Sequence, residues 1–184
     1  MTVASILWER LDTPGHDACR LEETHDGWRV DGSTVFLQDG APARLAYRVS
    51  CDRSWRALSG EVRGWLGRAS IELVVTRTKK GAWLLNGDLA LPPGDYGDLD
   101  IGGTPATNLL QIRRMGLEVG QQADCPVAWL DVSAGSLEVL AQTYERRSEV
   151  GYWYEAPRFS YAAMLEVGDT GFVRDYPGLW RAVV

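Results

Sequence analysis

The sequence has few of the features that mark exported, membrane-spanning or nucleic-acid-binding proteins. No stretch approaches the roughly 18 consecutive apolar residues that a membrane-spanning helix needs. The first residues hold no basic segment, and Glu9 introduces a charge early, which is unlike a secretory signal. Lys and Arg total 19 against 25 Asp and Glu, and no basic stripe occurs. The sequence therefore predicts a cytoplasmic protein with no membrane span and no nucleic-acid partner.

Motifs for catalysis and metal binding are missing too. Cys19, Cys51 and Cys125 form an odd set without CxxC spacing, which excludes a disulfide framework and favours free, buried thiols. His16 and His25 have no partner at metal-ligand spacing, and no nucleophile motif such as GxSxG occurs. We therefore expect no catalytic residue, no metal site and no cofactor.

Strand and turn signals dominate what is present. Turn residues recur about every 8–12 positions, between short runs in which apolar and polar side chains alternate. Such runs cover residues 44–49, 70–78 and 158–167, which fits a sheet with one buried side. A short helix is predicted from Thr104, as N-cap, to Gly116, and residues 136–147 fit a strand or a helix. The pattern predicts a mainly β fold with one or two short helices.

Proline and glycine concentrate near the middle of the chain. We predict a single domain over residues 1–184, in which a Pro/Gly-rich connector, 88–103, joins two β-rich structural repeats, 1–87 and 104–184. Both halves contain alternating runs bounded by Gly and Trp. Two interpretations stay open, namely an internal duplication and a chance match in a β protein that holds eight Trp.

Aromatic side chains are biased towards amphipathic rings. The chain has eight Trp and seven Tyr but only three Phe. Trp and Tyr each carry a polar atom that needs a partner when buried, so this surplus suits a cavity that is partly apolar and partly wet. The alternative is that these rings are ordinary residues of sheet faces. The candidate cavity residues are Trp28, Tyr47, Trp55, Trp65, Trp83, Tyr152 and Tyr154.

Two carboxylates and two guanidinium groups form the main polar constellation. Asp98 and Asp100 share one face if they lie on a strand, where they could perform acid–base chemistry or bind a hard cation. The alternative is an internal ion pair with Arg113 or Arg114. On a helix these two Arg diverge by about 100°, so only one of them can share a site, where it would hold an anionic headgroup.

Two segments carry a resemblance to a known family. DLDIGGTPATNLLQIRR at 98–114 and DYPGLW at 175–180 resemble the bacterial "putative glycolipid-binding" family, and the resemblance covers essentially the whole chain. It implies a spiral or rolled antiparallel sheet with internal duplication and an apolar cavity. It also implies binding of a glycolipid or a similar small amphiphile.

Three functions follow from these observations. The first is binding of an amphiphile without catalysis, with polar selection at the cavity mouth by Asp98, Asp100, Asn108, Arg113, Arg114 and Tyr176. The second is an enzyme that acts on a sugar or lipid headgroup through Asp98, Asp100 and Arg113. The third is a protein-interaction scaffold that uses exposed aromatic side chains. The sequence leaves the oligomeric state open.

Overall fold

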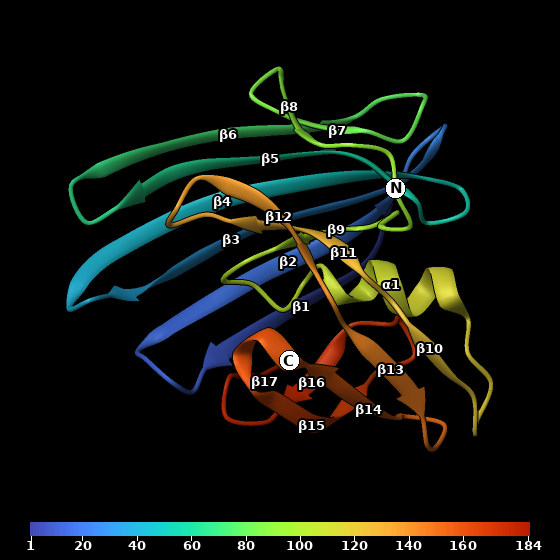
Figure 1. The fold of residues 1–184 in the computed structure, drawn as a ribbon. Coiled ribbons are helices and arrows are strands. Elements are labelled where there is room, and N and C mark those ends of the chain that lie inside the picture. The colour runs from blue at the N-terminus through green and yellow to red at the C-terminus, as the bar shows by residue number, and fades with distance from the viewer.

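The chain forms one large antiparallel sheet and one small sheet (Figure 1). This computed structural model describes all residues from Met1 to Val184. The large sheet has fourteen strands in the order β10-β13-β14-β15-β16-β17-β1-β2-β3-β4-β5-β6-β7-β8, and its end strands β10 and β8 do not pair. The predicted mainly β fold is therefore confirmed as an open antiparallel sheet.

The first half of the chain is a run of antiparallel neighbours. Its strands alternate buried and exposed side chains, as in β4, where Leu45, Tyr47 and Val49 are buried while Arg44 and Arg48 are exposed. This half therefore has one face on the core. The strands are β1 (Thr2–Arg10), β2 (Gly15–Glu23), β3 (Gly27–Gln38), β4 (Ala41–Asp52), β5 (Ala57–Leu66), β6 (Ala69–Arg77), β7 (Trp83–Leu85) and β8 (Asp88–Leu91).

The second half joins the first through its last strand. β17 pairs with β1, and the register places Trp180 opposite Arg10. The end of the chain thus lies beside its beginning, although the two strands are far apart in sequence. The strands are β10 (Gln122–Asp124), β13 (Thr143–Arg146), β14 (Gly151–Ala156), β15 (Tyr161–Val167), β16 (Val173–Tyr176) and β17 (Trp180–Ala182).

The small sheet and the helix lie between the two parts of the large sheet, one formed by strands of the first half of the chain and the other by strands of the second half (Figure 1). β9 (Leu99–Ile101) pairs in parallel with β11 (Val127–Asp131), which pairs antiparallel with β12 (Ser136–Leu140). The helix α1 (Asn108–Met115) follows β9. β9 is buried throughout, and α1 buries Asn108–Ile112, so these elements fill the space that the large sheet encloses.

Local details differ from the sequence predictions at two points. The helix begins three residues later than predicted, with Thr107 as N-cap, because the bond from the Ala106 N–H to the Thr104 hydroxyl closes only a turn that precedes the helix. Gly116 ends it in a left-handed conformation, φ 54°, as expected. Residues Pro157–Phe159 form a 3₁₀ turn, η1, so the strand predicted over 158–167 begins only at Tyr161.

Other segments resolve what the sequence left open. Residues 136–147 form two strands, β12 and β13, and the connector 88–103 contains β8 and β9. The three cysteines are free and buried. No helix has the length and apolar character that a membrane crossing needs. The division into two repeats stays a prediction.

Candidate functional site: an aromatic pocket

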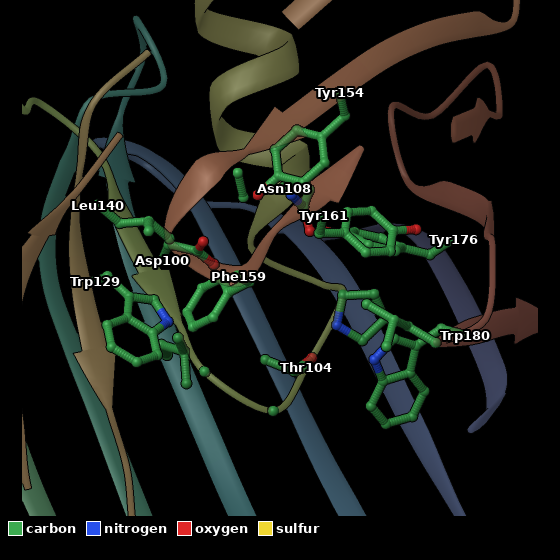
Figure 2. Close-up of a pocket in the computed structure, with 16 residues that line it drawn as sticks. Asp100, Thr104, Asn108, Trp129, Leu140, Tyr154, Phe159, Tyr161, Tyr176 and Trp180 are labelled. Atoms are coloured by element: carbon green, nitrogen blue, oxygen red, sulfur yellow. The ribbon is translucent and has the colours of Figure 1, made fainter. Parts of the chain in front are cut away.

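A pocket of about 380 Å³ opens where the helix, the small sheet and the second half of the large sheet meet. It is called the aromatic pocket below, because six of its sixteen lining residues carry aromatic rings. Figure 2 shows Trp129 and Phe159 on one side of it and Trp180 on the other. The lining residues are Asp100, Ile101, Gly102, Gly103, Thr104, Pro105, Asn108, Trp129, Leu140, Tyr154, Ala156, Phe159, Tyr161, Tyr176, Leu179 and Trp180.

The aromatic walls are held by contacts between the rings. Trp129 and Phe159 pack edge to face, with 5.3 Å between their centroids. The rings of Tyr154, Tyr161 and Tyr176 form a cluster with centroid separations of 5.3 to 6.2 Å. The Tyr161 hydroxyl donates to the carbonyl oxygen of Pro177 at 2.7 Å. These contacts fix the rings from β14, β15 and β16 around a common space.

Two arginines stack on wall residues without lining the pocket. The Arg10 guanidinium lies 5.3 Å from the centroid of Trp180 and pairs with Asp12 at 2.7 Å. Arg158 likewise lies 5.0 Å from the centroid of Trp129 and pairs with a carboxylate, that of Glu138. Cation–π stacking of this kind orients both indole rings. Because each guanidinium has its own carboxylate, neither supplies an unpaired positive charge to the pocket.

The polar end of the pocket is built around the buried carboxylate of Asp100. Thr107 donates to its Oδ1 at 2.7 Å, and Gln142 donates through Nε2 to its Oδ2 at 2.7 Å. No Arg, Lys or His forms a salt bridge with it, so burial raises the pKa of Asp100. The network continues through the hydroxyl of Tyr144, which donates to Gln142 and accepts a 2.8 Å hydrogen bond from the amide of Asn108.

A second buried carboxylate lies behind the pocket wall. The hydroxyl of Thr104 donates to the Tyr47 oxygen at 3.1 Å, and the Tyr47 hydroxyl donates to Asp17 Oδ1 at 2.6 Å. Asp17 Oδ2 has no hydrogen-bond partner. Burial therefore raises the pKa of Asp17 to about 7, although the hydrogen bonds oppose the shift. Tyr47 does not line the pocket, but it accepts a hydrogen bond from Thr104, which does.

The four charged residues of the sequence-predicted constellation are dispersed. Arg114 clamps Asp98, with Nε at 2.8 Å from both carboxylate oxygens. Arg113 points elsewhere and donates to the carbonyl oxygens of Asp169 and Thr170. Asp100 alone reaches the aromatic pocket. The alternative of an internal ion pair therefore describes Asp98 and Arg114.

The aromatic candidates from the first half of the chain lie outside the aromatic pocket. Trp28 stacks on Trp55 with 4.5 Å between ring centroids, and Arg113 lies over Trp55. Trp83 is fully buried and donates to the Tyr96 carbonyl, whereas Trp65 is 39% exposed. Tyr152, in the second half, is buried outside the pocket as well. The candidates that line the pocket are Asp100, Asn108, Tyr154 and Tyr176.

Several pocket residues had no role in the sequence prediction. Trp180 could have been found, because the DYPGLW segment forms a hairpin in which Tyr176 pairs with Trp180. Tyr161 belongs to the predicted alternating run. Trp129 gave no local signal, and neither did Gln142, which donates to Asp100 without lining the pocket, because only the tertiary fold brings β11 and the residue before β13 to β9.

Comparisons with known proteins agree with this fold. The sequence matches the family described as "Putative glycolipid-binding" over residues 5–182. The structure is similar to the crystal structure, at 1.80 Å resolution, of a DUF1089 family protein from Pseudomonas aeruginosa. The TM-score is 0.80, the sequences are 28% identical, and 91% of each chain is covered. A comparison with curated proteins found no match. Because the match spans nearly the whole chain, the protein belongs to the family described as "Putative glycolipid-binding".

Proposed function

We propose that this protein binds a glycolipid or a similar small amphiphile in the aromatic pocket and does not transform it. The observation that carries the proposal is the pairing of six aromatic rings with a polar end in one cavity of about 380 Å³. Apolar cavities with a few placed polar groups are typical of small-molecule sites. The faces of sugar rings pack on aromatic rings, while their hydroxyls need partners such as Asp100 and Asn108.

A neighbouring hollow offers room for an apolar tail. A second pocket of about 190 Å³ shares Gly102, Gly103 and Trp129 with the first, so the two pockets adjoin. Its lining includes the apolar residues Phe36, Leu45, Leu66 and Val132, together with Arg10, whose guanidinium is paired with Asp12. Burial of one methylene contributes about 0.8 kcal/mol, so a short tail adds several kcal/mol to binding. A headgroup in the aromatic pocket and a tail in the second pocket would use both.

The positions of the charged residues disfavour catalysis through the predicted constellation. Asp98 is occupied by Arg114, and Arg113 binds loop carbonyls, so neither stands beside Asp100 in the pocket. The free thiols of the three buried cysteines suit a reducing compartment, and we place the protein in the cytoplasm on that basis.

The proposal is tested by calorimetric titration with octyl β-D-glucopyranoside below its critical micelle concentration. Phe159 is half exposed and lines the pocket, so Phe159→Ala removes a wall ring at little cost to the core. We expect this variant to bind at least tenfold more weakly. Trp65→Ala, a half-exposed aromatic outside the pocket, is the matched control and should bind like the wild type. Absence of binding, or equal loss in both variants, would refute the proposal.

A further inference from the structure

The charge of the aromatic pocket restricts what its ligand carries. Among the lining residues, Asp100 is the one acidic side chain, and no Arg, Lys or His lines the pocket. A phosphate, sulfate or carboxylate headgroup would therefore face a buried carboxylate with no cation to offset the repulsion. A neutral group is tolerated, and a cation completes the missing ion pair.

The hydrogen-bonding groups at the polar end are mainly acceptors. Each Asp100 oxygen accepts one hydrogen bond from the protein, and a carboxylate oxygen has room for a second. The amide nitrogen of Asn108 is used by Tyr144, so the Asn108 oxygen is left to accept. Figure 2 shows Asp100 and Asn108 on the same side of the pocket, across from Thr104. A ligand group with several N–H donors fits this arrangement.

The ring cluster favours a cation as well. Tyr154, Tyr161 and Tyr176 all line the pocket, and a cation that lies over the face of one of these rings, within about 6 Å of its centroid, is attracted by the ring quadrupole. Their hydroxyls stay neutral, because burial raises their pKa values, to about 12 for Tyr161. The rings therefore attract a cation through their quadrupoles and add no formal charge of their own.

From these three observations we propose that the pocket recognises a protonated amino group on its ligand, an inference that rests on the proposed binding function. Asp100 and Asn108 accept its N–H groups, and the tyrosine cluster packs around it. Helix α1 begins beside Asp100, where Thr107 is the N-cap, and its N-terminal partial charge stabilises the carboxylate while the pocket is empty. The amino group comes from an amino sugar or from an alkylamine headgroup, which share this chemistry.

Matched probes test the inference at pH 6.5, where the amino group is protonated. Octyl 2-amino-2-deoxy-β-D-glucopyranoside and octyl β-D-glucopyranoside differ only by an amino group in place of a hydroxyl. We expect the amino probe to bind at least tenfold more tightly, and octanoate, which is anionic, to show no binding. Asp100→Asn keeps the shape of the side chain and should reduce the preference for the amino probe over the neutral glucoside to less than threefold. Asp88→Asn, an exposed site with the same charge change, should keep the full preference.

The outcomes distinguish failure of the amino-group inference from failure of the proposed binding function. Equal affinity of the amino and neutral glucosides overturns the amino-group inference but leaves amphiphile binding in place. Failure of every probe overturns both. If octylammonium binds as tightly as the amino glucoside, the amino group alone suffices and an alkylamine is the source. If octylammonium binds far more weakly, the sugar is required. The probe comparison on the wild type needs no variant, so a folding defect in Asp100→Asn would not obscure it.

Discussion

Asp98 and Asp100 lie two residues apart at the start of the small sheet, and both are buried, yet their surroundings differ. Asp98 is neutralised by Arg114 of the helix, which ties the approach to β9 to the last turn of α1. Asp100 receives neutral donors, Thr107 and Gln142, and lines the aromatic pocket. Asp98 therefore has a cationic partner, Arg114, whereas Asp100 has none. A paired carboxylate has a structural role, whereas an unpaired one beside a cavity is available to a ligand.

Breaking the paired carboxylate should have the largest effect. Asp98→Asn leaves the partly buried Arg114 without its counter-ion, and loss of one partner of a buried pair costs about 3–4 kcal/mol. We expect the free energy of unfolding, measured by urea denaturation, to fall by that amount. The probe affinity of the folded fraction should stay as in the wild type.

A double variant serves as the control for this loss. Asp98→Asn with Arg114→Met removes both charges, so it should recover most of the lost stability, because no uncompensated charge remains. A single variant as stable as the wild type would show that the ion pair contributes little, and the contrast with Asp100 would then fail.

Asp17 extends the comparison to a carboxylate that meets neither a cation nor the pocket. Burial raises its pKa from 3.8 to about 7, so the folded state holds the proton more tightly than the unfolded state. The stability that this provides is full below pH 4 and is lost as the pH rises through 7. Between pH 5 and 8 the loss from this residue is about 3 kcal/mol.

The measurement for Asp17 is the pH dependence of unfolding in wild type and in Asp17→Asn. The variant should lose less stability than the wild type over pH 5 to 8, by about 3 kcal/mol. Parallel pH profiles in the two proteins would refute the assignment of this titration to Asp17.

The contrast between Asp98 and Asp100 shows that the sequence predicts local features but not long-range contacts. Alternation along strands such as β4 predicts a mainly β fold, because each strand buries one face and the period of two is local. The Gly116 stop is local as well, since only the left-handed region is required there. The helix start was placed wrongly, because Thr104 caps a separate turn through the Ala106 N–H, and the helix begins only at Asn108.

The candidate site depends on contacts between residues that lie far apart in the sequence, and local sequence patterns do not reveal such contacts. Asp98 and Asp100 look alike in the sequence, and their difference comes from Arg114 and Gln142, which the fold brings to them. The aromatic surplus predicts a ring-lined cavity, yet it could not tell stacked Trp28 from pocket-lining Tyr154. Only the pairing of β17 with β1, and of β9 with β11, decides which rings share a space.

Substitution of Asp100, which has no cationic partner, should change the free energy of unfolding in the opposite direction. Asp100→Asn removes a buried charge that has no counter-ion, while the Gln142 amide can turn to pair with the new amide. Because Asp100 is buried without a counter-ion, and burial raises its pKa, we expect urea denaturation at pH 8 to show a gain of about 1 kcal/mol, where Asp98→Asn shows a loss. A loss as large as that of Asp98→Asn would mean that Asp100, too, is primarily structural.

The smallest expected change in stability is that of Arg113→Gln, and it distinguishes Arg113 from its neighbour Arg114. Arg113 is exposed and donates to loop carbonyls of Asp169 and Thr170, whereas Arg114 holds a buried carboxylate. Arg113→Gln should therefore cost about 0.5 kcal/mol, the scale of an exposed polar contact, while Arg114→Gln should cost several times more. Neither side chain lines the aromatic pocket, so probe affinity should be unchanged in Arg113→Gln. A strong loss of binding in that variant would restore the headgroup role that the sequence suggested for Arg113, and would move the polar end of the site from Asp100 to the outer end of the helix.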